Sequence, residues 1–73
     1  MKVYFTNSLH VKQMQAAGSI HETRKSANRE LRDRQSSESP FPWIVVLVEY
    51  HDSFANRHFA GYYVTTNDDS HIV

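Results

Sequence analysis

Cysteine is absent from these 73 residues, and glycine and proline occur only twice each. The lack of cysteine excludes disulfides and thiolate-ligated metal sites, and it fits a reducing, cytoplasmic environment. The longest apolar run, residues 43–48, falls far short of the ~20 residues that a membrane-spanning helix needs. The N-terminus turns polar after six residues, which is not typical of a signal peptide.

The chain length predicts a single domain over residues 1–73. A domain of this size buries only ~60% of the surface that its unfolded chain exposes, so its stability depends on one modest apolar core. Four Phe, four Tyr and one Trp are present, and a short chain uses aromatic residues in its core first and on contact surfaces second.

The N-terminal half predicts one strand followed by helical structure. Residues 2–6 have strand composition, and Asn7 or Ser8 is suited to cap a short helical segment that Gly18 ends. Ser19 and Glu22 match a capping box, which predicts a main helix over residues 20–34. The spacing also predicts Arg29–Asp33 and Glu30–Arg34 pairs along that helix.

The C-terminal half predicts a linker, a hairpin and a tail. Pro40 and Pro42 mark a linker over residues 35–42. Residues 43–50 are nearly all apolar and predict a central strand that is covered on both faces. Residues 57–66 predict its antiparallel partner, with Gly61 at a bulge or a close approach, and residues 67–73 predict a flexible acidic tail. The expected fold class is α+β: a small three-stranded, largely antiparallel sheet with one main helix packed on a face.

Formal charge is zero overall but unevenly distributed along the chain. Residues 1–34 carry seven Lys or Arg and three Asp or Glu, a net of +4, whereas residues 35–73 carry one Arg and five acids, a net of −4. This asymmetry indicates either contact with charged macromolecular surfaces or attraction between the two halves of the chain.

The titratable residues do not match the spacing of an active site or a metal site. His51 and His58 flank a turn that also contains Asp52, and these three residues are candidate zinc ligands. Glu49 lies nearby in the sequence and is a candidate for acid–base chemistry. Nothing in the sequence brings these groups together, and so short a chain has little room for a substrate pocket. We therefore expect no catalytic residues, no metal and no cofactor.

Two binding modes remain open. In the leading one, the protein contacts another protein through surplus aromatic residues or an exposed strand edge, as a monomer; the alternative explanation of the aromatics is a well-filled core. In the other, the arginine-rich stretch 24–34 binds RNA or DNA, although its interleaved acids weaken this interpretation. The residues expected to contact a partner are Lys2, Tyr4, Phe5, Arg24, Arg29, Arg32, Tyr62 and Tyr63.

Over its full length, the sequence also resembles a known kind of protein. The residues that suggest this are the opening Met-Lys-Val-Tyr-Phe-Thr-Asn-Ser-Leu-His, the arginine-bearing middle and the later Phe-Pro-Trp-Ile-Val-Val-Leu-Val-Glu-Tyr. The chain resembles the small transcription antiterminators of lytic bacteriophages that bind bacterial RNA polymerase. The resemblance implies action in the host cytoplasm and docking near the N-terminus of the β′ subunit and the RNA exit channel. It also implies read-through of intrinsic terminators with the host factor NusA, and inhibition of initiation at host promoters.

Overall fold

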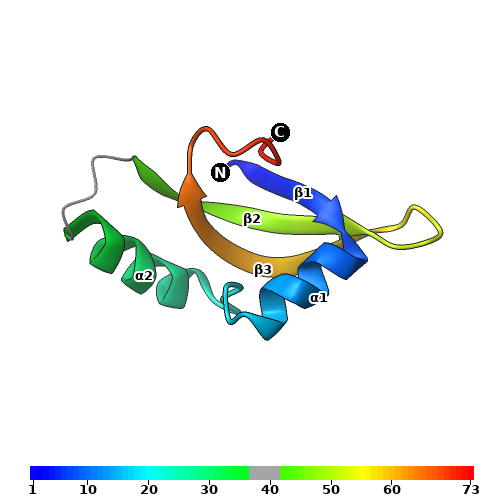
Figure 1. Ribbon diagram of the computed structural model, residues 1–73, viewed down its shortest axis with the longest axis horizontal. Helices are drawn as coiled ribbons and strands as arrows, with labels where there is room; N and C mark the ends of the chain where they lie inside the picture. Colours follow the sequence, from blue (N-terminus) through cyan, green and yellow to red (C-terminus); the bar gives the residue numbers. More distant parts are fainter. Residues whose placement is uncertain (37–41) are drawn as a thin grey trace.

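A computed structural model of the protein describes residues 1–36 and 42–73 (Figure 1). Five elements follow in the order β1 (Val3–Asn7), α1 (Ser8–Ala16), α2 (Arg24–Ser36), β2 (Trp43–His51) and β3 (Arg57–Thr66). The α+β class predicted from the sequence is confirmed. The helix α2 ends two residues later than predicted, at Ser36, and residues 37–41 of the predicted linker lie outside the described residues.

The three strands form one mixed sheet in the order β1-β2-β3. The central position predicted for the apolar strand β2 is confirmed. It pairs antiparallel with β3 as expected, whereas β1 pairs parallel with β2, from Val3 opposite Leu47 to Asn7 opposite His51. A parallel pair requires a crossover connection of a dozen or more residues, and the segment that carries both helices provides it.

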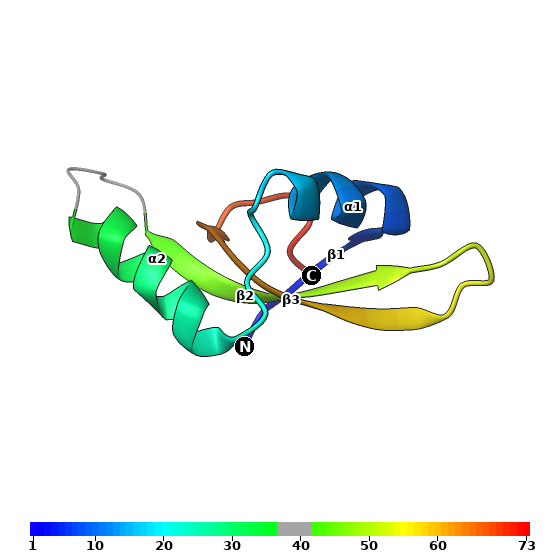
Figure 2. The same ribbon diagram turned by 90° about the horizontal axis from the view of Figure 1, so that it is seen from below.

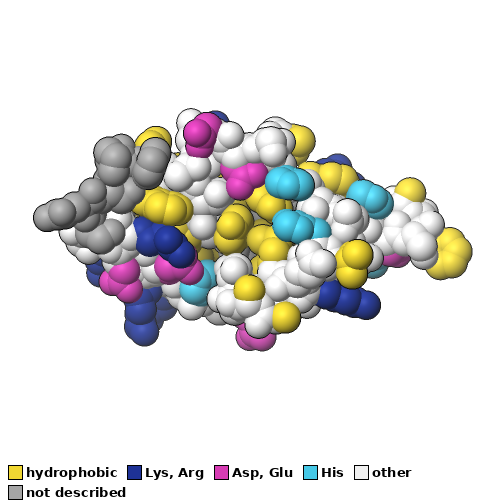
Figure 3. Space-filling view, in the orientation of Figure 1, with side chains coloured by type: hydrophobic (Ala, Val, Ile, Leu, Met, Phe, Trp, Pro, Cys, Tyr) yellow, Lys and Arg dark blue, Asp and Glu magenta, His cyan; other side chains and the backbone are white. Residues whose placement is uncertain are grey.

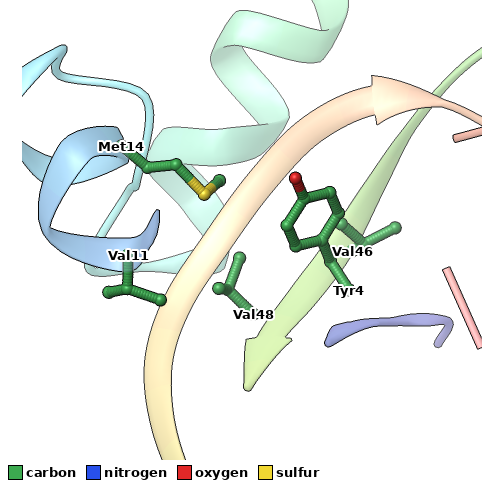
Figure 4. Packing of buried hydrophobic residues seen from close by; sticks show 5 residues of the cluster. All are labelled: Tyr4, Val11, Met14, Val46 and Val48. Atoms are coloured by element: carbon green, nitrogen blue, oxygen red, sulfur yellow. The ribbon is translucent and has the colours of Figure 1, made fainter. Parts of the chain in front are cut away.

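The main core lies between α1 and one face of the sheet. Tyr4 from β1, Val11 and Met14 from α1, and Val46 and Val48 from β2 are buried there and point toward one another (Figure 4). The period of two in a strand puts Val46 and Val48 on the same face. At about 25 cal/mol per Å² of buried apolar surface, this cluster supplies much of the favourable free energy of folding.

Helix α2 covers the opposite face of the sheet, so that β2 is enclosed between the two helices (Figure 2). Ala27 of α2 and Val64 of β3 are buried outside the main core, and the Arg34 guanidinium lies 4.7 Å from the centre of the Trp43 ring. Enclosure on both faces explains why β2 lacks polar alternation. Within the described ranges, neither helix combines the length and apolar character required to cross a bilayer.

The N-terminus of α1 agrees with the prediction, whereas the N-terminus of α2 does not. Asn7 caps α1 as expected, because its side chain accepts a hydrogen bond from the His10 N–H (2.8 Å). The predicted start of α2 at residue 20 is wrong: Thr23 accepts from the Ser26 N–H (3.1 Å), and the helix begins at Arg24.

His21, which precedes α2, pairs with the edge of β3 and is not part of the helix. His21 and Tyr62 exchange two backbone hydrogen bonds of 2.8 Å each. Gly61 permits this approach, because a Cβ there would lie 2.5 Å from the His21 carbonyl oxygen, and its φ is +137°. The predicted role of Gly61 at a bulge or close approach is confirmed, since the β2–β3 register shifts between Val48 and Glu49.

The outer edge of β1 is also occupied by the chain itself. Of residues 67–73, predicted as a flexible tail, the last three lie along this strand, with Ile72 opposite Tyr4 (Figure 1). The Phe5 N–H donates to the His71 carbonyl and the Val73 N–H donates to the Val3 carbonyl, both at 3.0 Å. Both outer strands therefore use part of their edge internally, which reduces the edge available to an extended peptide.

Candidate binding surface on helix α2

The exposed side of α2 carries a continuous row of cations. Arg24, Lys25, Arg29 and Arg32, together with Asn28, line a shallow open hollow of about 420 Å³. We call these five residues the basic stripe. Their spacing of i, i+1, i+4, i+5 and i+8 places them on one side of the helix over about 12 Å. In Figure 3, Lys and Arg atoms lie at the α2 end of the molecule with Asp and Glu atoms among them.

Glu30, one of the two acids of α2, is engaged away from the basic stripe. Glu30 is turned toward His21 Nε2 and Arg34 Nε, each 2.6 Å from a carboxylate oxygen, which confirms the predicted Glu30–Arg34 pair. Burial alone would raise the pKa of Glu30, but the hydrogen bonds with His21 and Arg34 outweigh it and hold the pKa below its usual value. The predicted Arg29–Asp33 pair is not among the ion pairs that the described residues form.

The position of the basic stripe within α2 strengthens its positive potential. It starts at the first residue of the helix, and the first turn contains no acid. The N-terminus of a helix carries about half a positive charge from its aligned peptide dipoles. Arg24 and Lys25 therefore add to this field, and the stripe is suited to an anionic surface such as phosphate or clustered carboxylates.

Among the described residues, the acidic half of the chain forms no ion pair with the basic half. Across residues 1–36 and 42–73, each ion pair joins residues of the same half: His21–Glu30 and Arg34–Glu30 in one, Arg57–Glu49 and His58–Asp52 in the other. The charge asymmetry of the sequence is therefore not cancelled by ion pairs between the two halves of the described chain.

Five of the eight residues expected to contact a partner lie away from the basic stripe. Tyr4 is only 4% exposed and is a core residue, and Tyr63 packs edge-on against it with ring centroids 5.3 Å apart. Phe5 and Tyr62 are half-buried on the face of the sheet opposite the main core, and exposed Lys2 donates to Asn67. The structure therefore brings together Arg24, Arg29 and Arg32, and the aromatic residues of the set do not line the hollow with them.

Of the residues considered for a zinc site, His58 Nε2 and Asp52 lie 2.9 Å apart, but His51 lies on the other face of the sheet. His51 stacks on Phe5 on one face of the sheet (ring centroids 5.6 Å apart), whereas His58 stacks on Tyr50 on the other (5.2 Å). Glu49 is engaged by Arg57 at 3.1 Å, away from Asp52. In the part of the chain that the structure describes, no group of three or more such side chains is arranged to hold a metal ion.

Two members of the basic stripe, Lys25 and Asn28, were not among the expected contact residues. Helical spacing identifies both residues, because Asn28 is i+4 from Arg24 and Lys25 is i−4 from Arg29. The predicted helix start at residue 20 did not alter this spacing.

No protein-family model, no curated protein and no solved structure matches this chain.

Proposed function

We propose that this chain is a non-enzymatic binding protein that regulates bacterial RNA polymerase in the host cytoplasm, suppressing intrinsic termination and inhibiting initiation at host promoters. The full-length resemblance to phage antiterminators supports the choice of partner. The basic stripe is the observation that carries the binding role, because four cations face solvent side by side on one helix. The proposed contact lies on the β′ subunit near the RNA exit channel, with NusA as a further partner.

The stripe has the properties of a contact surface that is ready to bind. Its four cations form no ion pair among the residues that the structure describes. An unpaired surface charge gives up little when a partner approaches, and complementary charge raises the association rate and fixes orientation. The helix is held from behind by buried Ala27, so the stripe is presented on a rigid support.

Binding to purified RNA polymerase at ~0.15 M salt tests this proposal. Wild-type protein should be retained by immobilised core enzyme, and Arg29→Glu or Arg32→Glu should weaken retention while leaving the fold intact. The matched control is Lys12→Glu, which makes the same charge change at an exposed position of α1. Failure of core and holoenzyme to retain the wild type would refute the polymerase assignment, and equal loss in the control would show a general charge effect.

The same stripe favours a second candidate function, direct binding of RNA or DNA. Three of its four cations are arginines, which bind phosphate oxygens with two parallel hydrogen bonds and stack on bases. Neutralising up to four phosphates of single-stranded RNA predicts a log–log salt slope of up to about −3. Labelled RNA titrated at two salt concentrations measures this slope. If the protein does not bind RNA, or binds it independently of salt, and is retained by polymerase, the function of the stripe is the protein contact.

A further inference from the structure

The β2–β3 hairpin projects beyond the body of the protein and carries an aromatic residue at its end. Figure 1 shows the hairpin extending past both helices, and Figure 3 shows hydrophobic atoms at its extreme end. Phe54 is 84% exposed there, more than any other large hydrophobic residue among those described. Turns are dominated by Gly, Pro, Asn, Asp and Ser, so an exposed phenylalanine at this position is unusual.

The loop that presents Phe54 is held by a network of hydrogen bonds centred on Asp52. One carboxylate oxygen accepts from the Phe54 N–H (2.8 Å) and the Asn56 N–H (3.0 Å), and the other lies 2.9 Å from His58 Nε2. The backbones of Asp52 and Asn56 are also joined by a 3.0 Å hydrogen bond. The hydrogen bond with His58, followed by those from the loop N–H groups, lowers the pKa of Asp52 to about 2. Phe54 is therefore displayed on an ordered loop.

An exposed aromatic ring on an ordered loop is a feature of protein-binding surfaces. Aromatic anchors that fill a partner's pocket dominate many interfaces, and an ordered loop reduces the entropy lost on binding. Residues 43–58 contain two carboxylates, Glu49 and Asp52, and one cation, Arg57, which pairs with Glu49 at 3.1 Å, so the formal net charge of the hairpin end is −1. This charge disfavours phosphate, and hence a nucleic acid backbone or an anionic membrane, and it favours a protein pocket with a neutral or basic rim.

We propose that the hairpin end is a second interaction surface, in which Phe54 inserts into an apolar pocket of a protein partner while Asp52 faces a cationic group at the pocket rim. The identity of the partner rests on the proposed function, which places this pocket on RNA polymerase. The surface is separate from the basic stripe, because the hairpin end and α2 lie at opposite ends of a molecule 42 Å long (Figure 1).

Affinity for purified RNA polymerase core enzyme, measured by biolayer interferometry, tests the anchor. Phe54→Ala should weaken binding by about tenfold or more, as expected for an aromatic hot spot. The matched control is Leu9→Ala, which removes another exposed hydrophobic side chain (66% exposed) from α1 and should change affinity by less than about twofold. Thermal unfolding of each variant verifies that the fold is retained.

The outcomes separate the two proposals. Absence of wild-type binding refutes the polymerase assignment and the anchor with it. Wild-type binding with unchanged affinity of Phe54→Ala refutes the anchor alone. Binding of the wild type to vesicles of phosphatidylcholine with phosphatidylglycerol, lost in Phe54→Ala, would assign the tip to a membrane and overturn the protein pocket.

A pair of Asp52 variants tests the role of the ordered loop. Asp52→Ala removes the acceptor of the Phe54 and Asn56 N–H groups and should weaken polymerase binding although Phe54 is still present. Asp52→Asn keeps an oxygen acceptor for these N–H groups but removes the charge, so its loop should be ordered as in the wild type. Any loss of affinity that remains in Asp52→Asn relative to the wild type measures the contact between the Asp52 charge and the cationic rim. Wild-type affinity in both variants would contradict the proposed use of Asp52.

Discussion

Val46 illustrates how much of this small fold depends on single core residues. Its side chain is fully buried between β1, α1 and β3, in a domain with one main core cluster. Val46→Asp should unfold the protein, because an unpaired buried charge costs several kcal/mol and a small domain has about that much stability in total. A proton–nitrogen correlation spectrum should collapse to the narrow dispersion of an unfolded chain. Leu9→Asp, at an exposed position, should keep the native spectrum.

Tyr4 links the core to alkaline stability. Burial, with smaller contributions from Asp69 and Tyr63, raises the pKa of Tyr4 to about 12. Because the pKa is about 10 in the unfolded chain, the stability that depends on the neutral hydroxyl is fully present below pH 10 and is lost as the pH rises through about 12. Urea unfolding at several pH values should therefore show the wild type losing stability relative to Tyr4→Phe between pH 10 and 12. A constant difference between the two proteins would contradict this account.

At the scale of elements, the approach of residues 20–21 to β3 depends on Gly61. A Cβ at this position would lie 2.7 Å from Ile20 Cγ2 and even closer to the His21 carbonyl oxygen, and φ is positive. Gly61→Ala should lower the free energy of unfolding by more than ~2 kcal/mol, because backbone strain and a backbone clash combine. Gly18→Ala is the control: φ there is +72°, yet nothing lies within 4 Å, so only the conformational cost of roughly 1–2 kcal/mol is expected. Equal losses in the two variants would remove the steric explanation.

Local signals predicted the strands well and the connections poorly. The apolar run of β2, the Asn7 cap and the Gly18 stop are short-range features, and each specifies its element with little help from the rest of the chain. Ser19 and Glu22 also form a local signal, which predicts a helix from residue 20. Two backbone hydrogen bonds between His21 and the edge of β3 outweigh this signal. The parallel pairing of β1 with β2 depends on how the whole crossover packs, which no local pattern encodes.

The candidate surfaces were only partly predictable for a related reason. Arg24, Arg29 and Arg32 could be expected to act together because helical spacing is a local property. Tyr4 was expected at the surface, but its burial depends on contacts with Tyr63, His10 and His71 from three other parts of the chain. Phe54 lies in turn sequence, and its exposure follows from the length of the hairpin beyond the helices, which is set by the packing of the whole domain (Figure 1).

At the scale of the whole molecule, the two proposed surfaces differ in physical character and should affect different rate constants. The basic stripe acts through charge, so Arg29→Glu should mainly lower the association rate and reduce its dependence on salt. Phe54 acts through apolar contact made after encounter, so Phe54→Ala should mainly raise the dissociation rate. Because the two sites lie at opposite ends of the long axis, the double variant should show the two losses in binding free energy added together. Association and dissociation rates with polymerase core enzyme at two salt concentrations measure both effects. If Phe54→Ala changed only the association rate, or if the double variant were no weaker than either single one, the two ends could not be making independent contacts with one partner.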